Sequence, residues 1–504
     1  MNKLIEKLVE YASVHLSLGE LDKIYVRNLL LNRFKEDKPY EGEIDKEEIK
    51  SMNTPDILID EIKEKAINRG IVDEAHADLF ACEIMGIISL RPNEFLNEFN
   101  KRRKEQGVDS ALYYFYDYEI KNNYIQKTSI DKNILWTYDR LERIEISINL
   151  SKPEKKNSDI AKMLNVSSTS YPKCLLCKDN LGFSGNLSKA PRQNIRIIPL
   201  TMGGEKWFLQ YSPYGYYREH CIVINDTHKP MTIGRQTFVN LFDFIDEFPT
   251  YFIGSNADLP IVGGSILSHE HYQGGRHRFP LFDSKVRYAI KKHMFPSVKM
   301  EYLNWYNSVI KLSGTNRDEI TNLASHILNK WKQFDCEEVD IISHDSNGPH
   351  STITPIANME NGRYQLFLIL RNNRCNETYP EGIFHAHKEH HNIKSEGIGL
   401  IEAMGLFILP GRLERQIREI EYILSNKVEV NDEYLEKRDI SIHREMINRM
   451  INDFGQDNSK KKAHEIIINH INDTCLDILS NTAVFKKDEN GEKAFRKFIE
   501  FLGV

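Results

Sequence analysis

Hydrophobic residues recur at helical spacing through the first part of the chain. Apolar side chains stand three or four positions apart, for example at Leu4, Leu8 and Tyr11, which is the spacing that lines one face of a helix. At Thr54-Pro55-Asp56 a residue that can cap a helix precedes a proline, which the first turn tolerates. The pattern predicts a helical N-terminal region over residues 1–150.

After a polar, charged connection at residues 152–158, the pattern changes to short β-like runs. These runs are rich in β-branched and aromatic residues, which favour strands. An amphipathic helix is expected between the last two runs, at residues 232–248. The predicted strands are residues 195–198, 207–211, 221–224 and 251–253.

A second mixed segment extends from about residue 315 to residue 412. It contains a predicted helix at residues 319–334 and strand-like runs at residues 351–354 and 364–370. The rest of the chain, from Gly411, is again mostly helical and charged. Strands with an intervening helix indicate a mixed layer of helices and sheet.

The chain has 504 residues, more than one hydrophobic core usually organises, so two or more domains are expected. We predict an α+β fold. One His-x-His at residues 269–271 and another at 385–387, each after strand-like runs, suggest two related halves. The predicted parts are a helical N-terminal region at residues 1–150, a catalytic half at 151–314, and a second half with C-terminal helices at 315–504.

Composition and charge are those of an ordinary globular protein. Hydrophobic residues make up 40% and charged residues 28%, and the net charge of −6 offers no general attraction for nucleic acid or an anionic membrane. No apolar run is long enough to cross a bilayer, and we expect no signal peptide. Seven scattered cysteines favour a reducing compartment. The expectation is a cytoplasmic protein without nucleic-acid or membrane partners.

The most informative stretch runs from His269 to Gln273, and glycine pairs flank it on both sides. In an extended segment side chains alternate between faces, so His269, His271 and Gln273 would share one surface. A neutral imidazole can attack phosphorus and form a covalent intermediate, and a side-chain amide can donate to a phosphoryl oxygen. A bare His-x-His is nevertheless more often structural or metal-binding than nucleophilic.

Cys174 and Cys177 form a CxxC motif, a spacing that lets two thiolates bind one Zn²⁺ ion. Metal binding and redox chemistry are its usual functions in a cytosolic chain, and two free thiols in a turn are the alternative. A tetrahedral site needs two more ligands, for which His228 and His269 are the best candidates. If His269 binds the metal it cannot attack phosphorus, and His271 becomes the candidate nucleophile.

Eighteen contiguous residues, 258–275, resemble the signature of the class II galactose-1-phosphate uridylyltransferases. These are the bacterial UDP-glucose–hexose-1-phosphate uridylyltransferases typical of Firmicutes. The resemblance spans most of the chain and is weaker in the N-terminal region. It continues in residues 349–357, 370–373, 382–387 and 398–412.

The resemblance implies a ping-pong exchange in galactose metabolism. UDP-glucose would donate its uridylyl group to His271 and release glucose 1-phosphate. Galactose 1-phosphate would then accept that group and leave as UDP-galactose, while Gln273 would contact the phosphoryl oxygens. The family analogy also implies a homodimer and no organic cofactor.

Class I relatives add expectations about fold and metal. They consist of two halves, each related to the histidine-triad nucleotide-binding proteins, and they share the His-x-His-x-Gln core. The present chain departs from their motif in having Glu270 where they have proline. The analogy implies a structural zinc site made of Cys174, Cys177, His228 and His269.

Several other polar residues are candidates for substrate binding, although each has an ordinary structural explanation. Arg218 precedes the 221–224 strand and could meet a phosphate, while surface exposure is the usual state of an arginine. Asn256 and Asp258 could bind ribose or phosphate or simply form a turn. The other candidates are Ser265, Ser268, Arg371, Asn372 and Glu402, of which the last three could instead form a buried polar network.

Two other functions would also use these motifs. A nucleotide hydrolase or phosphorylase could employ the same covalent histidine with water or phosphate as the acceptor. A zinc-binding scaffold protein would use both His-x-His pairs only to hold metal. A uridylyl adduct that persists until a sugar phosphate is added would distinguish the transferase from the hydrolase or phosphorylase.

Overall fold

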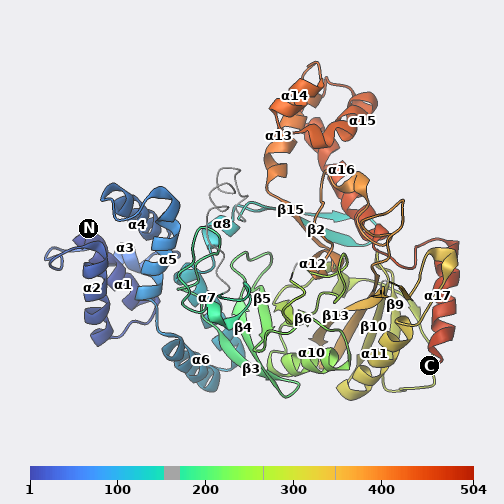
Figure 1. The fold of residues 1–504 in the computed structure, drawn as a ribbon, viewed down its shortest axis with the longest axis horizontal. Coiled ribbons are helices and arrows are strands. Elements are labelled where there is room, and N and C mark those ends of the chain that lie inside the picture. The colour runs from blue at the N-terminus through green and yellow to red at the C-terminus, as the bar shows by residue number, and fades with distance from the viewer. Residues whose placement is uncertain (152–170, 265, 347) are drawn as a thin grey trace. The chain divides into compact units, whose positions relative to one another are not determined.

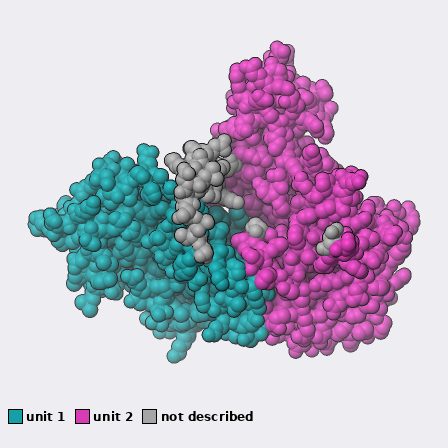
Figure 2. All heavy atoms as spheres, in the orientation of Figure 1, with its two compact units in different colours: residues 1–132, 153–229, 269–276 teal, residues 133–152, 230–268, 277–504 magenta. Residues whose placement is uncertain are grey.

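The computed structural model describes residues 1–151, 171–264, 266–346 and 348–504 of the chain. It contains helices and sheets in a mixed arrangement (Figure 1), so the predicted α+β class is confirmed. The chain divides into two compact units, each assembled from separate stretches of sequence (Figure 2). Unit 1 comprises Met1–Lys132, Pro153–Lys229 and His269–Arg276, and unit 2 comprises Asn133–Lys152, Pro230–Ser268 and His277–Val504.

The N-terminal part of unit 1 is helical, as the apolar spacing predicted. Leu4, Leu8 and Tyr11 are all fully buried on one face of α1. The predicted start at Thr54-Pro55-Asp56 is confirmed, since α4 begins at Asp56 with Pro55 before it. The helices are α1 (Asn2–His15), α2 (Glu20–Phe34), α3 (Lys46–Lys50), α4 (Asp56–Asn68), α5 (Ala77–Ile88), α6 (Pro92–Gln106), α7 (Val108–Lys121) and α8 (Lys127–Ile130).

Four antiparallel strands of unit 1 pair in the order β3-β4-β5-β7. All four bury most of their side chains, with Trp207, Leu209 and Val223 at 1% exposure or less. The predicted strands at 207–211 and 221–224 are confirmed. The strand predicted at 195–198 instead begins at Ile198, the last residue of the predicted range. The bounds are β3 (Ile198–Met202), β4 (Glu205–Tyr211), β5 (Cys221–Asn225) and β7 (His271–Gly275).

In unit 2, six strands pair in the order β6-β13-β14-β10-β9-β8. Helices α10 (Arg235–Glu247) and α11 (Arg317–Trp331) pack on them (Figure 1). The predicted helices at 232–248 and 319–334 and the strands at 251–253 and 364–370 are confirmed to within a few residues, whereas the strand predicted at 351–354 starts as expected but extends to residue 360. The strands are β6 (Phe252–Gly254), β8 (Val286–Ala289), β9 (Lys299–Leu303), β10 (Val309–Gly314), β13 (Ser351–Glu360) and β14 (Arg363–Asn372).

Unit 2 also contains two smaller sheets and the C-terminal helices. One sheet has the order β1-β2-β15, and the other pairs β11 (His344–Asp345) with β12 (Gly348–Pro349). The helical C-terminal part is confirmed. These elements are β1 (Ile134–Asp139), β2 (Arg143–Asn149), β15 (Leu406–Pro410), α12 (Leu400–Ala403), α13 (Arg412–Ser425), α14 (Asp432–Lys437), α15 (Arg444–Phe454), α16 (Lys460–Asn481) and α17 (Glu489–Leu502).

The prediction of helix up to residue 150 was wrong for its last part. Residues 134–149 form β1 and β2, because β2 lies between β1 and β15 in one sheet and buries every side chain after Arg143. The predicted connection at 152–158 lies outside the described residues. Within the described part of the chain, no helix has the length and apolar character required to span a membrane.

Candidate active site and metal centre

His271 is the first residue of β7, where β5 pairs with it in antiparallel register and places Ile224 opposite. Gln273 is two positions further along, so its side chain leaves the same face of the strand as that of His271. Tyr272 leaves the other face and stacks on Trp207, with ring centroids 4.8 Å apart. This stacking anchors β7 and leaves the imidazole and the amide on a common surface.

A hydrogen bond decides which ring nitrogen of His271 carries the proton. Nδ1 lies 2.8 Å from the backbone oxygen of His269, and because a carbonyl oxygen only accepts, Nδ1 must donate. The neutral ring then has its lone pair on Nε2. Burial lowers the pKa of His271 and so favours the neutral form. A neutral imidazole in this tautomer is able to act as a nucleophile at Nε2.

The amide of Gln273 is oriented by His220, which directly precedes β5. His220 Nε2 lies 3.0 Å from Gln273 Oε1, and burial lowers the pKa of His220 to about 4, so the ring is neutral at physiological pH. With Nε2–H donating to Oε1, the amide nitrogen of Gln273 remains available to donate to a phosphoryl oxygen. Sequence reasoning missed His220, because no local motif contains it.

Glu270, which stands between the two histidines, belongs to a buried hydrogen-bond network. Its carboxylate accepts from Asn225 Nδ2 at 3.0 Å and from the Tyr272 hydroxyl at 3.3 Å, and Lys229 Nζ lies 3.3 Å away. Backbone bonds also join Asn225 N to Glu270 O and Glu270 N to Lys229 O. The residue that departs from the class I motif thus fixes the segment between the two histidines.

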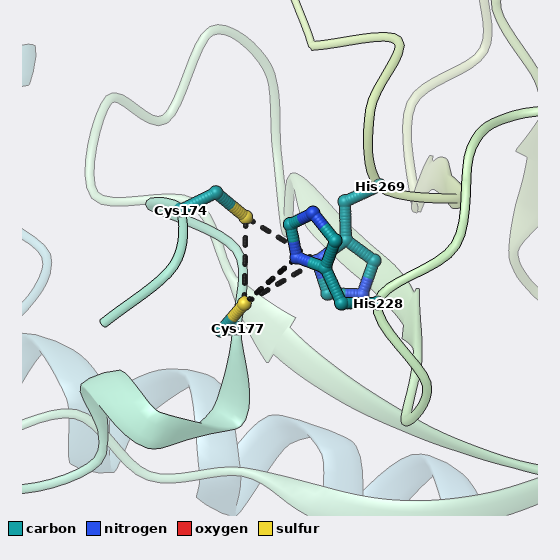
Figure 3. Close-up of side chains that lie close together, drawn as sticks. All are labelled: Cys174, Cys177, His228 and His269. Carbon is teal, nitrogen blue, oxygen red and sulfur yellow. Dashed lines mark hydrogen bonds between the residues drawn. The ribbon is translucent and has the colours of Figure 1, made fainter. Parts of the chain in front are cut away.

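Cys174, Cys177, His228 and His269 form a compact cluster in unit 1 (Figure 3). Their ligand atoms all lie within 4.8 Å of one another. The two Sγ atoms are 3.6 Å apart, and Sγ–Nδ1 distances range from 3.1 to 3.7 Å. A tetrahedral Zn²⁺ ion with usual bond lengths separates its ligand atoms by about 3.4–3.8 Å. The predicted set of four residues therefore has the composition and spacing of a metal site.

The surroundings of the cluster favour metal binding. His269 Nε2 lies 2.8 Å from the backbone oxygen of Asn225, so Nε2 donates and Nδ1 faces the thiols with its lone pair. Burial opposes ionisation of Cys174, but the adjacent His269 ring and a hydrogen bond from the Leu176 amide lower the pKa of that thiol to about 7. Burial raises the pKa of Cys177 to about 11. A thiolate and two imidazole nitrogens, of which that of His269 is oriented by its backbone hydrogen bond, are thus available to a cation.

The second His-x-His pair has a different environment. Nε2 of His387 donates to the backbone oxygen of Ile383 at 3.1 Å, and Nε2 of His385 accepts from the Ile398 amide at 3.1 Å. Both rings therefore bond to nearby backbone. Within the described residues, the cluster at Cys174 is the one group of His, Cys, Asp or Glu side chains arranged to hold a metal ion.

The remaining candidates lie in both units, and Ser265 lies outside the described residues. Arg218, in unit 1, is exposed beside Glu219, with a 3.3 Å ion pair. The others lie in unit 2, where Ser268 is exposed and Asn256 is buried, its Oδ1 accepting from the Leu400 amide at 2.8 Å.

The other unit 2 candidates have protein partners of their own. Asp258 accepts from the Ile233 amide and the Thr352 hydroxyl. Asn372 donates to Ile342 O at 2.9 Å. Arg371 and Glu402 are buried, at 1% and 8% exposure. A buried polar network, which the sequence analysis gave as the alternative to substrate binding for Arg371, Asn372 and Glu402, is thus present around Asn372.

Comparison with known proteins identifies the family. The model described as "Galactose-1-phosphate uridyl transferase, N-terminal domain" matches residues 18–230, and the corresponding C-terminal domain matches residues 244–438. Among curated relatives, the galactose-1-phosphate uridylyltransferase of Caldanaerobacter subterraneus is 44% identical, covering 99% of this chain and 97% of its own length. That of Clostridium acetobutylicum is 44% identical over the full length of both, and that of Fusobacterium nucleatum is 41% identical over 99% and 98%.

These matches place the chain among the nucleotidyltransferases. It belongs to the galactose-1-phosphate uridylyltransferase family, as the resemblance predicted. A crystal structure of yeast Ap4A phosphorylase Apa2 aligns with a TM-score of only 0.32 and 8% identity, covering 65% of this chain and 94% of that chain. The family assignment follows from the sequence relatives alone.

Proposed function

We propose that the protein transfers the uridylyl group of UDP-glucose to galactose 1-phosphate through a covalent intermediate on His271. Nε2 attacks the uridylyl phosphorus; a P–N bond forms as the bond to glucose 1-phosphate breaks, and glucose 1-phosphate leaves. A phosphate oxygen of galactose 1-phosphate then attacks the same phosphorus and breaks the P–N bond, so that UDP-galactose leaves and neutral His271 returns. The names of the relatives support these substrates.

The observation that carries this proposal is the hydrogen bond from His271 Nδ1 to the backbone oxygen of His269. It holds the ring in the tautomer whose Nε2 can attack phosphorus, and no proton has to be removed first. The same bond can stabilise the positive charge that the ring acquires once Nε2 is bonded to phosphorus. Gln273 is assigned to the phosphoryl oxygens, because its amide nitrogen is free to donate.

We infer that the cluster of Cys174, Cys177, His228 and His269 holds a structural Zn²⁺ ion. Two thiols and two imidazoles are a donor set that zinc prefers, and a site filled by four protein ligands leaves no position for a substrate. Because His269 also supplies the carbonyl that bonds His271, a metal there would steady the nucleophile through the backbone. The ion would make the segment around His269 rigid, and the side chains of His271 and Gln273 would carry out the chemical steps.

The assignment is tested by mass spectrometry of the full-length protein after mixing with UDP-glucose alone. We expect a uridylyl adduct that persists until galactose 1-phosphate is added and then disappears as UDP-galactose forms. The His271→Asn variant should carry no adduct and lose at least about 10⁴-fold in exchange activity. The His293→Asn variant, which alters an exposed histidine, is the matched control and should react like the wild type.

Two outcomes would contradict the proposal. Full exchange activity in the His271→Asn variant would exclude His271 as the nucleophile. Rapid release of UMP without any sugar phosphate would indicate a hydrolase that uses the same histidine with water as acceptor.

A further inference from the structure

One buried arginine of unit 2 has hydrogen-bond donors that no protein group uses. Arg371 lies near the end of β14 and is 1% exposed. Its Nη2 donates to the backbone oxygen of Ile398 at 2.8 Å. Nε and Nη1 have no hydrogen-bond partner among the residues that the structure describes. Buried N–H groups without an acceptor are rare in folded proteins, so these donors suit an acceptor that is not part of the chain.

His385 supplies another donor of the same kind. Its Nε2 accepts from the amide of Ile398 at 3.1 Å, and Ile398 is also the residue whose carbonyl oxygen binds Arg371. Since Nε2 accepts, the proton of the neutral ring is on Nδ1. That Nδ1 is buried and, within the described part of the chain, also lacks a partner. Arg371 and His385, which both bond to Ile398, therefore have unused hydrogen-bond donors and no unused acceptor.

The buried Arg371 has no carboxylate at ion-pair distance among the described residues, although the charge of the nearby Glu402 favours its protonated form. The nearby acid Glu402 lies 3.1 Å from Lys394 Nζ, and the more exposed Glu396 lies 3.8 Å from the same atom. Lys394 is itself 4% exposed. Both carboxylates are thus engaged by Lys394, and among the described residues Arg371 forms no ion pair. A buried arginine stays protonated, so Arg371 holds its charge without an ion pair of its own.

We propose that Arg371 and His385 form a binding site for a phosphate group, either inorganic phosphate or the phosphate of a sugar phosphate. A phosphate offers several acceptor oxygens to donors on two side chains, and its negative charge offsets the buried guanidinium. Asn372 and Glu402 satisfy their polar atoms within the protein, which leaves Arg371 as the anion-binding member of that group. The binding of a sugar phosphate at this site rests on the proposed function, whereas the binding of inorganic phosphate does not.

Calorimetric titration of the full-length protein with inorganic phosphate tests the site. We expect saturable binding to the wild type that weakens at least about tenfold in Arg371→Met. Arg363→Met is the matched control, because it removes the same charge from an exposed position at the other end of β14 and should bind within about twofold of the wild type. Arg371→Lys, which keeps the charge and loses most of the donors, should fall between.

Thermal unfolding separates binding from misfolding. Without phosphate, Arg371→Met should unfold at or above the wild-type temperature, because a buried charge that has no ion-pair partner has been removed. Phosphate should raise the unfolding temperature of the wild type and of Arg363→Met and leave that of Arg371→Met unchanged. Absence of saturable binding to the wild type, or equal binding to Arg371→Met and Arg363→Met, would overturn the site.

Glucose 1-phosphate identifies the source of the phosphate. If it displaces inorganic phosphate and loses the same affinity in Arg371→Met, the site takes the phosphate of the substrate. If the binding of glucose 1-phosphate is unchanged in that variant while the binding of inorganic phosphate is lost, the site takes free phosphate. Both results support an anion site at Arg371. A wild type that binds phosphate through Arg371 but catalyses no exchange would contradict the proposed function alone.

Discussion

At the residue scale, one imidazole ring determines the direction in which the amide of Gln273 points. His220 has Tyr216 and Tyr217 against its ring, with centroids 5.5 and 4.4 Å away, and its Nε2 faces Gln273 Oε1. A glutamine amide that rotated by half a turn would present an oxygen to a phosphoryl oxygen and repel it. Under the proposed function, His220 would be a positioning residue that acts through Gln273.

Replacing His220 with phenylalanine should retain the ring packing and remove the donor. We expect kcat to fall about tenfold with little change in KM for UDP-glucose, because the amide stabilises charge that develops in the transition state. The decisive comparison is with Gln273→Ala. Adding His220→Phe to Gln273→Ala should cost no further activity, and an additive loss would show that His220 acts independently of Gln273.

The sequence indicated chemistry best where the pattern is local. The CxxC pair and the histidines at 228 and 269 were predicted as one set, and the structure brings their ligand atoms together. His220 could not be predicted, since its contact with Gln273 depends on the register of β5 against β7 across 53 residues. For the same reason the sequence did not separate Arg371, with its free donors, from Asn372, whose amide is satisfied within the protein.

At the element scale, strands that pair with distant partners were the hardest to predict. β15 pairs in parallel with β2, more than 250 residues earlier, and in β2 the isoleucines and the alternating Glu145 and Ser147 are all buried. Elements with a strong periodic pattern of their own, such as α10 and α11, were predicted to within a few residues. The rest depended on tertiary pairing, which one sequence does not reveal.

The packing of the C-terminal helices contains a buried histidine that makes their stability depend on pH. His443 is 1% exposed; its Nε2 donates to Gln416 of α13, and its Nδ1 accepts from Asn392. Burial lowers its pKa to about 4, below the value of about 6.5 in an unfolded chain. Between these values the unfolded state binds more protons, so stability falls as pH drops from about 6.5 to about 4.

Replacing His443 with glutamine should flatten this part of the pH dependence. The titration of His443 accounts for up to about 3 kcal/mol between its two pKa values. The measurement is urea unfolding at pH 7 and pH 4.5, followed by the helical signal of the wild type and the variant. His464→Gln, at an exposed position of α16, is the control. An equal loss of stability on acidification in the wild type and in His443→Gln would contradict the assignment.

At the scale of the whole molecule, the two compact units draw their residues from interleaved stretches of the chain. Every candidate metal ligand belongs to unit 1, although Cys174 and His269 are 95 residues apart in sequence. A metal ion would therefore join the segment around the CxxC motif to β5 and β7 within one unit. The Arg371 site, in contrast, is made entirely of unit 2 residues.

Removal of zinc should increase the rate of hydrogen exchange in unit 1 and leave that of unit 2 unchanged. We expect about one zinc ion per chain in the wild type and a loss of most of it in Cys174→Ser, measured by elemental analysis. Hydrogen exchange read by mass spectrometry should then show faster exchange in residues 171–229 and 269–276, because metal binding stabilises the folded arrangement of its ligands. Helices α10 and α11 in unit 2 should exchange as slowly as before. Cys375→Ser, which alters an exposed cysteine, is the matched control. Undiminished zinc in Cys174→Ser would refute the metal site. Equally faster hydrogen exchange in both units would refute a structural metal confined to unit 1.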